Sequence, residues 1–168
     1  MQIIESKDIL NNLNFSKWFE NSKTKNEYGV PMIFYHKSRS NEKFEEFRDD
    51  INKNPYNDCK GFYFVNHFNS NSFKHFANGV DVFCYLKMTN PLYLYYKNPD
   101  YHGSNEEIYN MLNINNDFVE RVKSQGFDSI VISNLGVFNA VDEYIVFDQN
   151  QIKHIDNTEF SDSPNIYK

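Results

Sequence analysis

Short hydrophobic runs separated by polar segments recur along the whole chain, and most of them have the length of a β-strand. They are rich in Ile, Val, Phe and Tyr, which favour strands, and Gly, Pro or Asn residues stand between many of them. The pattern predicts strands over residues 32–36, 61–65, 80–88, 92–96, 129–133 and 143–147, with one more over 151–155.

The spacing of apolar positions also predicts several helices. Residues 6–22 read as an amphipathic helix that has Ser6 as its N-cap, with a buried face made by Ile9, Leu10, Leu13, Trp18 and Phe19. Shorter helices are expected over 70–78, 104–113 and 116–125, the last ending before Gly126. Because strands and helices do not alternate regularly, we expect an α+β fold with a mostly antiparallel sheet.

The length of 168 residues predicts one domain, which we place at residues 1–156. With 16 Phe and 12 Tyr, its core should consist largely of aromatic side chains. Residues 157–168 are mostly polar and are predicted to form a loose tail.

Composition narrows the range of functions. The net charge of -6 argues against binding that depends on many phosphate contacts. Two cysteines make no disulfide framework, no spacing indicates a metal site, and no Gly-rich dinucleotide-binding or phosphate-binding motif is present. The chain shows no signal peptide and no transmembrane run, so we expect a cytoplasmic protein with no membrane partner, which also fits delivery into a host cell.

Three segments each place one polar residue in or beside a predicted strand. His36 ends the run MIFYH, where its ring can hydrogen-bond a ribose hydroxyl. Tyr63 in GFYFV should point away from its two Phe neighbours and can stack on a flat ring. Glu143 precedes the apolar run YIVF and can balance a growing positive charge. Taken singly, each has a structural alternative: a histidine at a strand end, one aromatic among many, and a carboxylate facing water.

Taken in order, the segments YHKSRS, KGFYF and DEYIVFDQNQIKHI resemble the His–Tyr–Glu class of ADP-ribosyltransferases, which includes diphtheria toxin and the poly(ADP-ribose) polymerases. The chain is also similar to the small ADP-ribosyltransferase domains of bacterial and phage polyvalent proteins, through the ending FDQNQIK and the strand NPLY at residues 90–93. The resemblance covers roughly residues 30–155, and its glutamate segment is the most specific part.

The resemblance implies two small, mostly antiparallel sheets around an NAD⁺ cleft, with peripheral helices. It implies that Glu143 is the catalytic residue, which orients the ribose and stabilises the oxocarbenium-like transition state when the nicotinamide–ribose bond breaks. His36 would hold ribose hydroxyls and Tyr63 would stack on nicotinamide. NAD⁺ is then the substrate, and no metal is expected.

Further binding residues are implied by position in the same motifs. Lys37 and Ser38 follow the histidine, and either Ser70 or Ser72 matches the family serine that holds the carboxamide. Lys37 stands where the family has a glycine whose backbone grips the nicotinamide amide. A lysine can offer the same N–H and C=O if its φ is negative.

The loop before the glutamate often faces the acceptor in this class. Residues 134–142 contain no basic residue, and Val137 and Phe138 are predicted to be exposed there. Val141 stands where arginine-specific enzymes carry a second glutamate, which disfavours transfer to arginine. An aromatic loop tip can contact a protein or stack on an unpaired base, or it can pack down as an anchor.

The expected activity is mono-ADP-ribosyl transfer to a macromolecular acceptor, either protein or nucleic acid. The small size fits a toxin, a defence protein, or a phage or effector enzyme, with a neutralising partner protein as a further expectation. Two alternatives stay open at this point: NAD⁺ hydrolysis with water as the acceptor, and an inactive copy of the fold that binds a partner or nucleotide.

Overall fold

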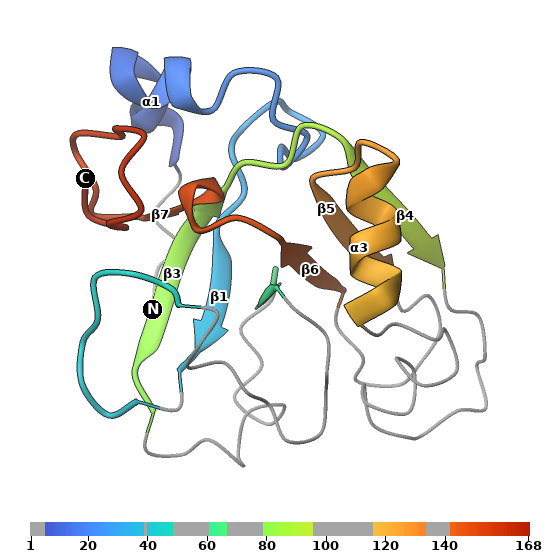
Figure 1. Ribbon diagram of the computed structural model, residues 1–168. Helices are drawn as coiled ribbons and strands as arrows, with labels where there is room; N and C mark the ends of the chain where they lie inside the picture. Colours follow the sequence, from blue (N-terminus) through green and yellow to red (C-terminus); the bar gives the residue numbers. More distant parts are fainter. Residues whose placement is uncertain (1–5, 39, 49–60, 67–78, 96–115, 134–141) are drawn as a thin grey trace, which may run out of the picture.

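The chain folds as a twisted β-sheet with helices packed on one of its faces (Figure 1). The computed structural model describes residues 6–38, 40–48, 61–66, 79–95, 116–133 and 142–168. The elements in chain order are η1 (Ser6–Asn11), α1 (Leu13–Trp18), β1 (Phe34–Lys37), β2 (Phe62–Val65), β3 (Asp81–Leu86), β4 (Pro91–Tyr95), α3 (Asn116–Ser124), β5 (Ser129–Ser133), β6 (Glu143–Val146), η3 (Gln149–Gln151) and β7 (Ile152–His154).

All seven predicted strands are present within two residues of their expected bounds. The predicted helix over 116–125 corresponds to α3, and Gly126 follows it with a φ of +88°, as expected for a C-cap glycine. The helices predicted over 70–78 and 104–113 lie outside the described residues.

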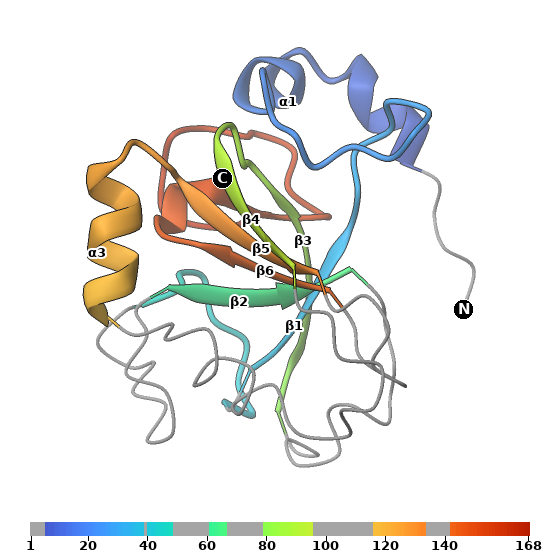
Figure 2. The ribbon, with the colours of Figure 1, turned by 90° about the vertical axis from the view of Figure 1, so that its right-hand side faces the viewer.

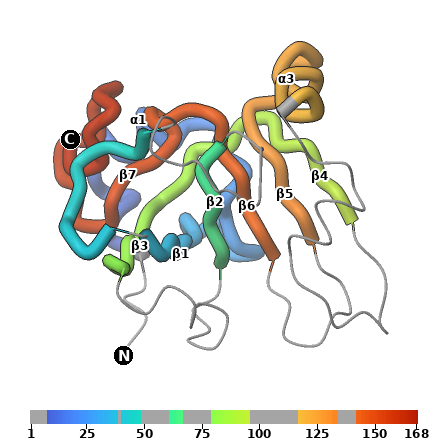
Figure 3. The backbone as a smooth tube through the Cα atoms, turned by 60° about the horizontal axis from the view of Figure 1, so that its bottom comes forward, coloured from blue at the N-terminus to red at the C-terminus, as the bar shows by residue number. Residues whose placement is uncertain are grey.

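The described strands form one sheet in the order β4-β5-β6-β2-β1-β3-β7, which Figure 3 shows from the right to the left of the molecule. Within it, β4 and β5 are parallel and every other pair is antiparallel. The mostly antiparallel α+β arrangement is therefore as predicted, whereas the hydrogen-bond pattern joins the strands into one sheet where we expected two.

β1 and β2 share far fewer registered residue pairs than the other neighbouring strands do. Only Tyr35 and Val65 are registered across it, whereas β1 and β3 share four registered pairs and β2 and β6 also share four. The sheet thus consists of two halves, β4-β5-β6-β2 and β1-β3-β7, joined at one point. We call this junction the seam.

The two α-helices in the described residues, α1 and α3, pack on the same face of the sheet, which we call the helical face. Val119 and Val122 of α3 lie against Ile130 and Ile145, while α1 covers the other half through a cluster of aromatic side chains that includes Tyr85 of β3. Figure 1 and Figure 2 show α3 beside β5 and β6 and α1 at the opposite end of the molecule. The other face carries the largest core cluster, which includes Phe34, Phe62 and Phe64 of β1 and β2.

The predicted helix over 6–22 is wrong in its extent, and its predicted buried face is right for Ile9, Trp18 and Phe19 but wrong for Leu10 and Leu13. Asn12 interrupts it, because its side-chain oxygen accepts a hydrogen bond from Phe15 N at 3.0 Å and caps a new, shorter helix, α1. The new start changes which residues face inward. Phe15 is fully buried with Trp18 and Phe19, whereas Leu10 and Leu13 are 43% and 84% exposed.

The C-terminal residues 157–168 do not form the loose tail that their polarity predicts. Ile166 is fully buried, and Phe160 packs edge-on against Phe15 with the ring centroids 4.9 Å apart. Lys153 of β7 is fully buried, and its ammonium donates to the carbonyls of Ser163, Asn165 and Lys168. Backbone carbonyls thus bind a buried cation, a pairing that residue polarity by itself does not reveal.

Lys153→Met should lower the free energy of unfolding by about 3 kcal/mol, because it removes a charged donor from several buried carbonyls while keeping the length of the side chain. The exposed Lys17→Met is the matched control and should change stability by less than about 0.5 kcal/mol. Urea unfolding of both variants measures this. Equal stability of the two variants would contradict the clamping role of Lys153.

Candidate active site

Tyr63 and Glu143 lie on the same face of the sheet. In the β2–β6 register, Tyr63 is opposite Ile145 and Val65 is opposite Glu143. Residues opposite each other point to the same side, so all four share the helical face, where Ile145 packs against α3. Tyr63 and Glu143 are diagonal neighbours on adjacent strands, roughly 7 Å apart between Cβ atoms. Both side chains are half-buried.

The segment GFYFV alternates as predicted, and its glycine allows β2 to lie close to β6. Phe62 and Phe64 are buried in the core of the opposite face, and Tyr63 packs on the helical face. Gly61 has a φ of +132°, and a Cβ there would lie 2.8 Å from Ile145 Cγ2. A side chain at Gly61 would therefore push β2 away from β6 and change the relative position of Tyr63 and Glu143.

His36 lies in the seam between the two halves of the sheet. Its ring packs against Phe47 and Phe64, with centroids 5.0 and 5.4 Å away, so it belongs to the face opposite to Tyr63 and Glu143. Its Nδ1 is 2.8 Å from the carbonyl oxygen of Tyr63. The histidine and the tyrosine of the predicted site are thus joined through the tyrosine's backbone and not through its ring.

The hydrogen bond to Tyr63 defines the protonation of the His36 ring. A carbonyl oxygen only accepts, so Nδ1 carries a proton in this contact. Burial lowers the pKa of the imidazole, and the hydrogen bond to the Tyr63 carbonyl offsets this only in part. The neutral ring is therefore favoured, and its Nε2 is left as a hydrogen-bond acceptor.

Lys37 presents its backbone and its side chain in different directions. Ser38 N donates to Val80 O at 3.0 Å, so the backbone of Ser38 bonds toward β3. Successive residues of an antiparallel strand direct their backbone hydrogen bonds to opposite sides. The N–H and C=O of Lys37 therefore point away from β3 and toward the seam. Among the described non-glycine residues, Asn21 and Phe160 have a positive φ, and Lys37 does not. Its φ is therefore negative, the conformation that a lysine at this position requires.

The other predicted site residues are less informative. Ser38 is buried, and its Oγ accepts a hydrogen bond from Ser40 N at 3.0 Å. Ser70, Ser72, Val137, Phe138 and Val141 lie outside the described residues. The structure therefore brings together Tyr63, Glu143 and the backbone of Lys37 on or beside the helical face, with His36 in the seam.

A polar cluster between β1 and β3, on the side of β1 away from the seam, was missed by the sequence analysis. Asp81, at the start of β3, accepts hydrogen bonds at one oxygen from Tyr35 Oη at 2.7 Å and from Lys37 Nζ at 2.5 Å. Asp81 starts the run DVFCYL and resembles an ordinary strand-end charge in the sequence. Only the β1–β3 register, which sets Lys37 opposite Asp81, reveals the cluster.

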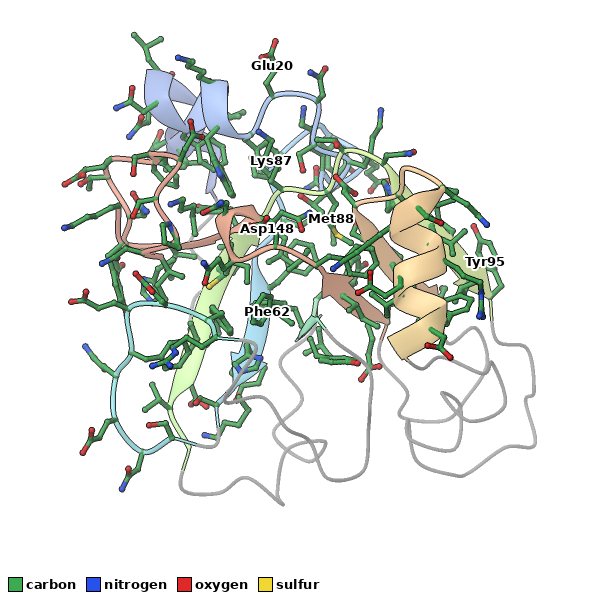
Figure 4. The ribbon with its side chains drawn as sticks, in the orientation of Figure 1. Glu20, Phe62, Lys87, Met88, Tyr95 and Asp148 are labelled. Atoms are coloured by element: carbon green, nitrogen blue, oxygen red, sulfur yellow. The ribbon has the colours of Figure 1, made fainter. Side chains whose placement is uncertain are left out.

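A hollow of about 380 Å³ lies elsewhere, between the end of α1, the end of α3 and the connection from β6 to β7. Figure 4 labels Lys87 and Asp148, two of its lining residues, above Phe62. No predicted site residue lines it. In the described part of the chain, no three His, Cys, Asp or Glu side chains form a possible metal site. None of the described helices has the length and apolarity needed to cross a membrane.

A mostly antiparallel sheet with few helices, which carries Tyr63 and Glu143 on adjacent strands, is compatible with the α+β fold of ADP-ribosyltransferases. The sequence model of the family described as ADP-ribosyltransferase in polyvalent proteins matches residues 26–162. Because this match covers most of the chain, the protein belongs to that family, whose enzymes use NAD⁺ as substrate. Comparison with curated proteins and with solved structures found no match.

The depressed pKa of His36 predicts a loss of stability in mild acid. The folded protein binds the proton on this ring less tightly than the unfolded chain does, so stability falls as the pH drops below the ordinary value of 6.5. Urea unfolding at about pH 7.5 and about pH 5.5 should show a larger loss for wild type than for His36→Asn. Burial also lowers the pKa of His154. This residue is present in both proteins, so its contribution to the loss of stability cancels in the comparison. Equal losses would contradict the assignment.

Proposed function

We propose that this protein is a mono-ADP-ribosyltransferase, which cleaves the nicotinamide–ribose bond of NAD⁺ and transfers ADP-ribose to a macromolecular acceptor. The observation that carries this proposal is the common placement of Tyr63 and Glu143 on the helical face, in registered pairs two positions apart on adjacent strands. The family to which the chain belongs supports the general reaction.

The spacing of Tyr63 and Glu143 suits the two parts of the substrate that separate during the reaction. A nicotinamide ring stacked on Tyr63 would have its ribose about one ring width away, on the side of Glu143. As the bond to nicotinamide breaks, positive charge develops on the ribose, and the carboxylate of Glu143 stabilises it. The same carboxylate accepts a hydrogen bond from a ribose hydroxyl and so orients the sugar for attack.

The seam supplies hydrogen-bonding groups of the kinds that NAD⁺ requires. His36 lies on the face opposite to Tyr63 and Glu143, so its Nε2 accepts a hydrogen bond from a ribose hydroxyl that reaches the seam from that face. The N–H and C=O of Lys37, directed toward the seam, match the C=O and NH₂ of a carboxamide. Ser38 and either Ser70 or Ser72 complete the proposed binding set by their positions in the motif.

Glu143→Gln should reduce kcat by about 100-fold or more, because it removes the charge and keeps the shape of the residue that faces the developing cation. Release of nicotinamide from NAD⁺ measures this. The matched control is Asp142→Asn, which neutralises the adjacent carboxylate while leaving an oxygen for Ser133 Oγ, its donor at 3.1 Å. Equal turnover by wild type and Glu143→Gln would overturn the proposal.

The acceptor is found by incubating the protein with ADP-ribose-labelled NAD⁺ and a cell lysate, then treating one portion with nuclease and the other with protease. We expect transferred label in wild type and none in Glu143→Gln. Label that resists nuclease and is lost with protease identifies a protein acceptor, and the reverse identifies nucleic acid. Free nicotinamide without transferred label would instead assign NAD⁺ hydrolysis, and the absence of NAD⁺ consumption would assign an inactive binding module.

A further inference from the structure

The lysine that follows His36 carries its side chain on the face that the proposed reaction uses. Tyr35 is registered with Val65, and Val65 is opposite Glu143, so these three residues form a row across the helical face. Lys37 is two residues beyond Tyr35 on β1 and therefore points to the same face. Glu143 lies two strands away from it, at a strand separation of roughly 10 Å.

A long, flexible, positively charged side chain in this position interferes with the proposed site unless it is restrained. An unrestrained lysine has several rotatable bonds and three donors, so it can reach across the seam or approach the carboxylate of Glu143. Either movement would obstruct the proposed contact of the Lys37 backbone with a carboxamide or neutralise the charge that Glu143 contributes. The side chain must therefore be held elsewhere if the site is to function.

The structure contains such a restraint on the side of Lys37 away from the seam. Asp81 stands directly opposite Lys37 in the β1–β3 register, and Lys37 Nζ lies 2.5 Å from Asp81 Oδ1. The same oxygen accepts a hydrogen bond from Tyr35 Oη at 2.7 Å. The Lys37 side chain is 13% exposed, whereas that of Asp81 is 43% exposed, so the lysine lies down against the sheet while its partner faces water.

The electrostatics of the cluster are consistent with a lasting restraint. Burial acts to raise the pKa of the Asp81 carboxyl, but the hydrogen bonds from Lys37 and Tyr35 and the charge of Lys37 outweigh it and leave the pKa below its ordinary value. Burial, followed by the hydrogen bond to Asp81 and its charge, raises the pKa of Tyr35. At neutral pH, Tyr35 therefore stays a donor and Asp81 stays a carboxylate.

We propose that Asp81 is a positioning residue for the NAD⁺ site: its carboxylate, which also accepts a hydrogen bond from Tyr35 Oη, binds the ammonium of Lys37 over β3, and so keeps the lysine side chain away from the seam and from Glu143 while the Lys37 backbone faces the substrate. The inference rests on the proposed function. The restraint by Asp81 explains how this chain can carry a lysine at the position where the family motif has a glycine. Because Asp81 is largely exposed, its contribution lies in orientation and little in stability.

The test compares Asp81→Ala, Lys37→Ala and the double variant Asp81→Ala/Lys37→Ala, with Glu159→Ala as the control for loss of an exposed carboxylate far from the site. Asp81→Ala should raise KM for NAD⁺ about tenfold, which corresponds to roughly 1.4 kcal/mol, with a smaller effect on kcat. In the double variant KM should return to within about threefold of the value for Lys37→Ala, because no ammonium remains to be misplaced. A residue with a merely structural role would not be rescued by removing its partner.

Three results would overturn the inference: an unchanged KM in Asp81→Ala, a raised KM that persists in the double variant, or a KM in Lys37→Ala raised as far as in Asp81→Ala. The last result would make the ammonium itself a contact for the substrate. Wild type and these four variants are also titrated with NAD⁺ by calorimetry, which requires no turnover. If wild type binds NAD⁺ without consuming it, the proposed function fails while the dissociation constants still decide the role of Asp81. If wild type does not bind NAD⁺, both proposals fail.

Discussion

Between β1 and β2 the sheet is held by a single registered backbone pair, Tyr35 with Val65, and by the hydrogen bond from His36 Nδ1 to the carbonyl of Tyr63. The histidine ring stands where the next backbone pair of a continuous ladder would form. Its Nδ1 bonds the Tyr63 carbonyl, which the Lys37 N–H would bond in a continued ladder, so the backbone groups of Lys37 face the seam without that pairing. The proposed site thus lies at an interruption of a sheet whose two halves are each well paired.

The two halves of the sheet contribute different parts of the proposed site. The half with β2 and β6 carries Tyr63 and Glu143 at a spacing defined by antiparallel register and by the close approach that Gly61 permits. The half with β1 and β3 carries His36 and Lys37, with Asp81 directing the lysine side chain. Large aromatic and branched side chains pack on each face of the sheet.

At the edges of the fold, segments that are mostly polar in sequence are packed against the core. Residues 157–168 look like a tail by composition, yet they cover core residues and surround the ammonium of Lys153 with carbonyl oxygens. At the other end, Asn12 ends one helical segment and starts another, which brings Phe15 into contact with Phe160. The two ends of the chain therefore stabilise one shared aromatic cluster at the edge of the sheet.

The sequence alone determined the strands and the α+β class and indicated the three motif residues, because strand alternation, turn residues and the EYIVFD ending are local signals that neighbouring residues carry. It did not determine that His36 lies on the face opposite to Tyr63 and Glu143, that Asp81 holds Lys37, or that Lys153 clamps the C-terminal segment. Each of these depends on which strands are neighbours and in which register. Strand order and register arise from contacts between residues far apart in the chain, so only the tertiary structure decides them.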